Sequence, residues 1–385
     1  MKKFICLLLC FVLLICIAGC KKNGSATSAQ TDANQQVGTD GPVAQKPLIS
    51  VSMPVINESL KSDDGTVLCN YIYQDMAIIF PDPEIADKVY IDFLNRVDAT
   101  RTTADSLYAD ANSAYTVSNS WSPYLCQYTY APERIDQSIL SMFGTYATYN
   151  GIGRPDVVYL GLTYDLITGD ELTLSNILSE GASVDSLIDL VVAALEVQKE
   201  EKFLDENFAQ TVKENFSGTY SEYNSWYFNQ TGLSFFFSPY EIAPYASGVI
   251  TVQIPYEKLP GIIKDDYFPA ERDSAKGALY CQDFADANLD NFTKFTELIA
   301  DKNAEQSVIY TDKAVYDVRV ERGSWSASGE DFTPQYTLFA AASLTPGDAF
   351  LIQAAIPDGK SDLRITYTTD SGPVCVFLQK GCTLS

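Results

Sequence analysis

The sequence predicts an α+β protein: an antiparallel sheet with packed helices, followed by a C-terminal all-β domain of the sandwich type. Helical and strand-like patterns occur in separate blocks, which favours antiparallel pairing over a regular βαβ sheet. Residues 306–385 carry period-two strand patterns with turn sequences at short intervals, as in a small β-sandwich. We therefore expect an α+β module over residues 47–265, a helical connector over 266–305 and a β-sandwich over 306–385.

The amino-terminal segment predicts export and lipidation. Met1-Lys2-Lys3 precedes a short apolar run, which is the pattern of a signal peptide over residues 1–19. The run ends in Ile17-Ala18-Gly19-Cys20, which resembles the bacterial lipobox, so the Cys20 thiol is the expected lipidation site. Residues 20–46 are polar and predict a flexible tether. The mature chain is thus expected on the outer face of the bacterial cell membrane, held there by its lipid anchor.

Each element of the α+β block has its own signal. Apolar runs on both sides of Ser62-Asp63-Asp64-Gly65 predict strands joined by a turn. Pro83 opens a helix whose apolar residues recur every four positions. A second helical block is broken near Phe203, and Gly218 ends it. The helical stripe consists of Ile85, Val89, Phe93 and Val97; further strands are expected over 124–130, 138–149, 157–162, 233–237 and 249–254, and the second helical block over 184–216.

The connector allows two readings. Residues 283–305 read as an amphipathic helix with apolar positions at Phe284, Phe292, Phe295, Leu298 and Ile299. Asp286, Asn288, Asp290 and Glu297 also match positions of a calcium loop. Asn291 stands where that loop requires glycine, so the helix is preferred and no metal site is predicted.

Composition excludes several function classes. The chain has no histidine, which rules out His-dependent nucleophilic relays and imidazole-ligated zinc. Its formal charge of −24 argues against nucleic acid and favours neutral or cationic partners. Its 50 acidic residues make a catalytic carboxylate pair impossible to identify without a structure. No catalytic residue and no cofactor are predicted.

The mature chain retains five cysteines besides Cys20, with no CxxC spacing. An odd number is not a complete disulfide framework. Cys375 and Cys382 are close enough to pair across a turn, but buried thiols would give the same pattern. The sequence leaves open the redox state of Cys69, Cys126, Cys281, Cys375 and Cys382.

Three stretches resemble an extracytoplasmic module of unknown function, found in lysozyme-sensing anti-sigma factors and at the amino terminus of some peptidoglycan deacetylases. They are Tyr164 to Leu174 (YDLITGDELTL), Gly232 to Gly248 (GLSFFFSPYEIAPYASG) and Val252 to Tyr256 (VQIPY). The resemblance covers roughly residues 47–264. The chain has Gly151-Ile152-Gly153-Arg154 where the family often has a histidine, so no role of that residue is carried over.

The resemblance implies a binding role. Tyr240, Glu241 and Tyr245 lie in the family signature, and Arg154 lies in the glycine-containing loop; these four are the candidate binding residues, although turn geometry alone also explains such residues. We expect non-enzymatic binding of a cell-wall component, such as peptidoglycan fragments, or of a wall-directed protein such as lysozyme. The alternative is an accessory envelope protein that contacts another surface protein through its β-sandwich. Enzymatic activity is a third, less favoured reading.

Overall fold

The computed structural model describes residues 48–116, 121–217 and 225–385. The predicted signal peptide, the lipidation site Cys20 and the tether over 20–46 lie outside these ranges. From Leu48 onward the described chain belongs to one compact unit. Within that part of the chain, no helix combines the length and apolar character that crossing a membrane requires.

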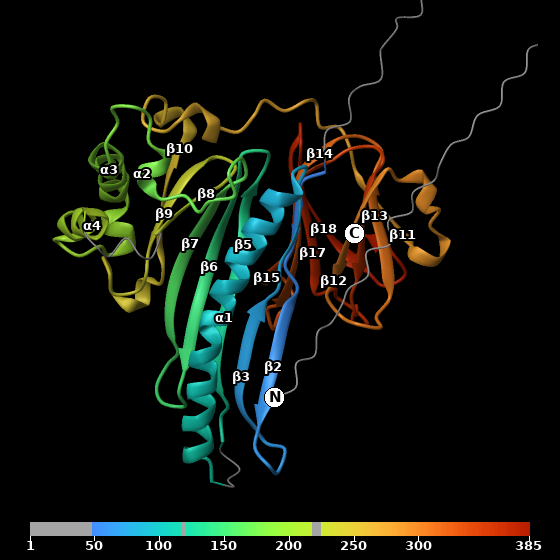
Figure 1. The fold of residues 1–385 in the computed structure, drawn as a ribbon, viewed down its shortest axis with the longest axis horizontal. Helices are drawn as coiled ribbons and strands as arrows, with labels where there is room; N and C mark the ends of the chain where they lie inside the picture. Colours follow the sequence, from blue (N-terminus) through green and yellow to red (C-terminus); the bar gives the residue numbers. More distant parts are fainter. Residues whose placement is uncertain (1–47, 117–120, 218–224) are drawn as a thin grey trace, which may run out of the picture. The chain divides into compact units, whose positions relative to one another are not determined.

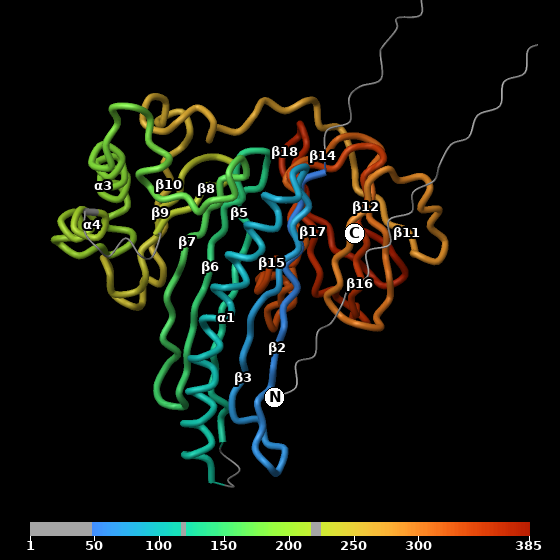
Figure 2. Tube along the Cα trace, in the orientation of Figure 1, coloured from blue at the N-terminus to red at the C-terminus, as the bar shows by residue number. Residues whose placement is uncertain are grey.

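A five-stranded sheet with the order β2-β3-β5-β6-β7 forms the centre of the α+β part. Its strands are β2 (Val55–Lys61), β3 (Val67–Gln74), β5 (Tyr124–Ile135), β6 (Ile139–Tyr149) and β7 (Asp156–Asp165). Strands β3 and β5 are parallel because helix α1 (Pro83–Ala114) carries the chain back along the sheet. The other neighbours pair antiparallel. Figures 1 and 2 show α1 lying along this sheet.

Helix α1 begins where the sequence predicts it. The Asp82 side chain accepts the Glu84 N–H at 2.9 Å, and Pro83 occupies the first turn, where a missing N–H costs nothing. The predicted apolar stripe is buried against the sheet, and the Phe93 ring meets the edge of Tyr130 with ring centroids 5.9 Å apart. The stripe therefore covers one face of the five-stranded sheet and leaves the opposite face for other contacts.

The middle of the chain forms a smaller helical and β-sheet layer. Its elements are α2 (Leu174–Ile177), α3 (Val184–Lys202), α4 (Phe208–Ser217), β8 (Trp226–Phe228), β9 (Gly232–Phe237) and β10 (Ile250–Pro255). Phe203 adopts a left-handed conformation that ends α3, which confirms the predicted break. Leu187 and Val191 of α3 share a core with Phe235 of the sheet β10-β9-β8.

A buried arginine connects this layer to the five-stranded sheet. The Arg134 side chain at the end of β5 is 0% exposed. Its Nη1 donates hydrogen bonds to the Tyr256 hydroxyl at 2.5 Å and to the Tyr267 carbonyl at 2.6 Å. Its Nε donates to Asp136 Oδ2 at 2.6 Å, and Nη2 lies 2.6 Å from the same oxygen without a well-aligned hydrogen bond. The guanidinium also lies over the Phe228 and Tyr256 rings.

The C-terminal part consists of two sheets that share one hydrophobic core. One has the order β19-β18-β17-β14-β15-β1-β4 and the other β11-β13-β16-β12. Phe339 of the first stacks on Phe350 of the second at 4.6 Å between centroids. The strands are β1 (Ser50–Ser52), β4 (Ala77–Ile79), β11 (Leu279–Asp283), β12 (Lys294–Ile299), β13 (Gln306–Thr311), β14 (Val315–Trp325), β15 (Phe332–Leu344), β16 (Asp348–Gln353), β17 (Leu363–Thr369), β18 (Gly372–Gln379) and β19 (Thr383–Leu384).

The α+β class with a β-rich C-terminal part is thus confirmed. One arrangement is not visible in the sequence pattern. Strand β1, near the start of the described chain, pairs with both β15 and β4, so amino-terminal residues complete the C-terminal sheet.

The predicted helix over 283–305 is wrong. Residues 284–286 and 289–291 form short 3₁₀ turns, in which the Asp283 and Asn288 side chains accept backbone N–H groups and so compete with a helix. Residues 294–299 form β12, which pairs parallel with β16. Thr296 and Leu298 are buried while Glu297 and Ile299 are exposed, so a period of two decides the structure.

The disulfide considered for Cys375 and Cys382 does not form. Cys382 forms a disulfide with Cys281 of β11, with the Cα atoms 5.5 Å apart, and Cys375 is a free, exposed thiol. Sequence proximity suggested the nearer cysteine, but the fold brings β11 to the C-terminal hairpin. Cys69 and Cys126 are buried free thiols.

Candidate binding surface

A tight turn after β9 builds the first part of the site. The Glu241 N–H donates to the Ser238 carbonyl at 3.1 Å, and the Tyr240 N–H donates to the Ala243 carbonyl at 3.1 Å. The Glu241 carboxylate accepts the backbone N–H of Ser238. Burial raises the pKa of Glu241, and the hydrogen bond from Ser238 opposes this rise. Glu241 thus stabilises the turn through its hydrogen bond with Ser238.

The turn displays Tyr240 to solvent. Its φ is +74°, in the left-handed region that non-glycine residues rarely adopt. Its side chain is nonetheless 75% exposed, although burying a tyrosine ring is favourable. A residue held in an uncommon conformation with its ring in solvent is a feature typical of binding sites.

Arg154 reaches the same turn from the loop between β6 and β7. Its guanidinium carbon lies 5.0 Å from the centroid of the Tyr245 ring. Tyr245 lies 5.4 Å from Tyr240, centroid to centroid, with the rings tilted by 37°. We call these three residues, Arg154, Tyr240 and Tyr245, the aromatic corner. The structure brings together three of the four predicted binding residues in a row and places Glu241 beneath them.

The glycines of the Arg154 loop are required by the backbone. Gly151 and Gly153 have φ values of +81° and +71°. A Cβ atom on Gly151 would lie 2.6 Å from the Tyr124 ring, so side chains are excluded there. The two glycines therefore shape the turn that presents Arg154.

A cluster of rings continues from the corner onto the face of the five-stranded sheet opposite α1; Phe143, Tyr159 and Tyr227 are half-buried and Phe236 is buried. Phe143 of β6 and Tyr159 of β7 stack with centroids 5.5 Å apart and an interplanar angle of 9°. Tyr227 and Phe236 contact the same Phe143 ring at 5.3 and 5.0 Å. Burial and the nearby Tyr245 raise the pKa of Tyr159. Sequence reasoning missed these rings, although strand alternation places Phe143 and its neighbours on one face.

A cleft of about 340 Å³ begins at Phe143 and lies between β5–β6 and β14–β15. It contains two carboxylates, each paired with an arginine. Arg319 Nη1 lies 3.2 Å from Glu133 Oε2, and Arg364 Nη2 lies 2.7 Å from Glu321 Oε2. Burial raises the pKa of Glu133, and the Arg319 charge opposes the rise.

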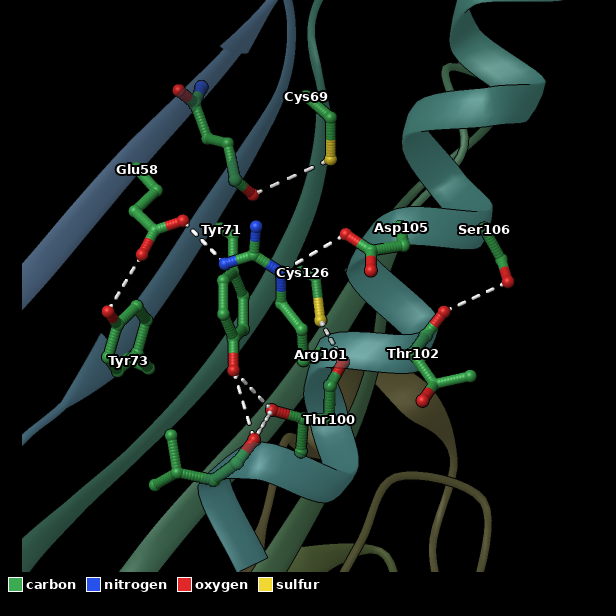
Figure 3. Close-up of polar contacts among 12 residues, drawn as sticks. Glu58, Cys69, Tyr71, Tyr73, Thr100, Arg101, Thr102, Asp105, Ser106 and Cys126 are labelled. Atoms are coloured by element: carbon green, nitrogen blue, oxygen red, sulfur yellow. Dashed lines mark hydrogen bonds and ion pairs between the residues drawn. The ribbon is translucent and has the colours of Figure 1, made fainter. Parts of the chain in front are cut away.

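A second groove, of about 300 Å³, lies between α1 and the β2–β3 hairpin. Figure 3 shows Arg101 between Glu58 and Asp105, at 2.6 and 3.1 Å. The Tyr73 hydroxyl donates to Glu58 at 2.8 Å, and this bond is the main cause of the lowered pKa of Glu58. Tyr73 stacks on Tyr71, with ring centroids 4.6 Å apart. These groups largely satisfy one another, so we interpret the cluster as a clamp between helix and hairpin.

Two buried thiols lie beside this clamp. Burial raises the pKa of Cys69 to about 11 and that of Cys126 to about 12, so both remain protonated at neutral pH. A protonated thiol is a poor nucleophile and a poor metal ligand.

The residues that match a calcium loop in the sequence do not form one loop in the structure, because they lie in different secondary-structure elements. Asn288 accepts the Asp290 N–H at 3.2 Å, and Glu297 lies on β12. Among the described residues, no group of three or more Cys, Asp or Glu side chains is placed to hold a metal ion.

These observations define an α+β protein with an exposed aromatic corner beside its sheet. Comparison with known families adds that residues 175–257 match a family described as "Protein of unknown function (DUF3298)". The match includes Tyr240, Glu241 and Tyr245, and Arg154 lies before it. A module of unknown function is thus confirmed within the span where the sequence motifs indicated one.

Two solved structures from the same family are similar. A DUF3298 family member from Bacteroides fragilis NCTC 9343 is 18% identical, with a TM-score of 0.44, over 57% of this chain and 95% of that chain. A DUF3298 family protein from Pseudomonas aeruginosa PAO1 is 15% identical, with a TM-score of 0.38, over 59% of this chain and 99% of that chain. A search of curated proteins found no match.

Proposed function

We propose that this chain is a lipid-anchored bacterial surface protein that binds a cell-wall component or a wall-directed protein such as lysozyme, without catalysing a reaction. The aromatic corner is the observation that supports the proposal most directly. It offers an exposed ring at Tyr240, a second ring at Tyr245 and a cation at Arg154 within one row. Aromatic and arginine side chains contribute most of the binding energy at many interfaces.

The net charge of the chain supports a basic partner in particular. A formal charge of −24 attracts a cationic protein over long range and raises its association rate, and added salt screens this attraction. The corner itself adds a positive charge, so we expect it to supply local contacts while the surrounding acidic surface steers the partner. The two contributions are separable because only the second depends strongly on ionic strength.

The test is isothermal titration of the mature chain, residues 20–385, prepared without lipid as the Cys20→Ser variant. Lysozyme and purified muropeptides are the two probes. Tyr240→Ala should weaken binding at least tenfold, or about 1.4 kcal/mol. Tyr280→Ala is the matched control, because Tyr280 is also exposed but lies on β11. Absence of heat with both probes at low salt, or equal effects of the two substitutions, would contradict the proposal.

A further inference from the structure

The cleft beside Phe143 is not used by the proposed function. One wall is the face of the five-stranded sheet that α1 leaves uncovered, because Tyr128 and Tyr130 point to the helix and the intervening residue Thr129 points away. The other wall is formed by β14 and β15. A cavity of about 340 Å³ falls within the range of small-molecule sites.

The charges of the cleft cancel one another. Glu133, Glu321 and Arg319 line the cleft, and Arg364 pairs with Glu321 from outside the lining, so the two ion pairs give two negative and two positive charges. An anion site needs net positive charge, and a divalent cation needs several unpaired carboxylates. A lipid chain would have to desolvate these charges. The cleft thus suits a ligand that is neutral and polar.

The ion pairs keep hydrogen-bonding capacity for such a ligand. Arg319 and Arg364 contact only Oε2 of their partner carboxylates, and within the described residues Oε1 of Glu133 and of Glu321 accepts no hydrogen bond. Arg319 uses Nη1 and Nη2 on Glu133, and Nε is not engaged in the described contacts. Charged acceptors and donors therefore stand side by side in the cleft.

One ring and neutral polar groups complete the lining. Phe143 is half-buried at one end of the cleft. Tyr336 of β15 belongs to the opposite wall, but its side chain packs against the core of the two C-terminal sheets, so Phe143 supplies the ring. The Thr129 hydroxyl accepts from Gln127 at 3.2 Å, which leaves its own hydrogen for donation. Gln335 is exposed at the rim, and its amide nitrogen donates one hydrogen to the Ser324 hydroxyl at 3.4 Å. The second amide hydrogen and the carbonyl oxygen are left for a ligand.

We propose that this cleft binds a neutral oligosaccharide of pyranose rings. A sugar ring presents a C–H face, which packs on an aromatic ring, and hydroxyl groups that both donate and accept hydrogen bonds. The cleft supplies both kinds of contact without net charge. The proposal extends the proposed function by assigning a glycan to a second site, and it does not depend on the aromatic corner.

The experiment titrates the unlipidated mature chain with tri-N-acetylchitotriose and with cellotriose. We expect one saturable site for at least one of them, with affinity that hardly changes with added salt, since the ligand is neutral. Binding of the first sugar alone indicates that the acetamido groups are recognised, and binding of both indicates recognition of ring and hydroxyls; either result supports the site.

Two cleft variants localise the binding. Phe143→Leu removes the flat ring with little loss of apolar volume, and Gln335→Ala removes the rim amide; each should weaken oligosaccharide binding at least tenfold. Gln137→Ala is the matched control, because Gln137 is exposed in the β5–β6 turn, outside the cleft. Thermal unfolding of each variant checks the fold, and Gln335→Ala at an exposed position keeps the test valid if Phe143→Leu is destabilised.

The two sites fail independently. Tyr240→Ala should leave binding of the two peptide-free oligosaccharides unchanged, and Gln335→Ala should leave lysozyme binding unchanged. Binding of neither sugar at millimolar concentration overturns the cleft proposal and leaves the corner proposal standing. Sugar binding that is unaffected by both cleft variants overturns the assignment to this cleft.

Discussion

Replacing Arg134 by methionine should strongly destabilise the protein. Methionine keeps the length and apolar character of the side chain but removes the guanidinium. The Tyr267 carbonyl then loses its hydrogen bond from Nη1, and the Asp136 carboxylate loses its cation. The cation–π contacts with Phe228 and Tyr256 are lost as well.

The expected size of the effect follows from burial. Removing one partner of a buried ion pair costs about 3–5 kcal/mol, because the remaining polar groups stay desolvated and unpaired. The Arg134 side chain is 0% exposed, whereas Asp136 is 26% exposed and also accepts the Ser138 and Ile139 N–H groups. Asp136 is therefore partly compensated, and we expect a loss of about 3 kcal/mol, a large part of the 5–15 kcal/mol typical of a domain.

The assay is urea unfolding of the mature chain, followed by circular dichroism and tryptophan fluorescence. The buried Trp226, whose ring lies 5.7 Å from Phe228, reports on the region around Arg134. Arg101→Met is the matched control: Arg101 pairs with Glu58 and Asp105, and these three side chains are 42%, 36% and 62% exposed, so its removal should cost about 1 kcal/mol or less. Equal losses for the two variants, or a loss below about 1 kcal/mol for Arg134→Met, would refute the burial argument.

Three further predictions concern other features. The double variant Cys281→Ser, Cys382→Ser should lose about 4–5 kcal/mol of stability, because the disulfide closes a sequence separation of 101, and dithiothreitol should reproduce the loss in the wild type but not in the variant. Glu241→Gln keeps an acceptor for the Ser238 N–H and avoids a buried charge; since the folded pKa of Glu241 is raised, the variant should match or exceed wild-type stability at pH 7. This advantage should disappear as the pH falls from the raised pKa through 4.5, where both states become protonated, and an advantage that grows below pH 4.5 in urea titrations would contradict it. Cys20→Ser should abolish incorporation of radiolabelled palmitate in cells, and label that persists would refute the lipid anchor.

Local patterns in the sequence predicted most of the elements. The four-residue spacing from Val89 to Val97 and the proline before it located α1, because burial of one helix face depends only on nearby residues. The alternation at Val318 and Val320 located β14 for the same reason. Residues 283–305 were predicted wrongly as a helix because their apolar residues fit both a helical and a strand period. Pairing of residues 294–299 with β16 stabilises the strand.

The candidate site was predictable only in part. The family signature indicated Tyr240 and Tyr245, and the glycine loop indicated Arg154. Their contact with one another depends on how two distant loops meet, which no local pattern records. The cleft was less accessible still, since Glu133 and Arg319 belong to strands whose approach is a property of the folded chain. Buried Arg134 shows the same limit, because arginine in a sequence usually indicates a solvated surface.

The position of β1 constrains how the protein can be synthesised and divided. Val51 pairs with Ala340, roughly 290 residues later, so β1 can pair with β15 only after nearly the whole chain has emerged. Until then the backbone of β1 lacks its β15 partner on one side, although the core around Val51 and Met53 is built mostly from residues 49–166. A shortened chain that ends before β15 would carry the same unfilled edge permanently. A cut at residue 265, the boundary expected from the sequence, would separate β1 from its partner strand β15.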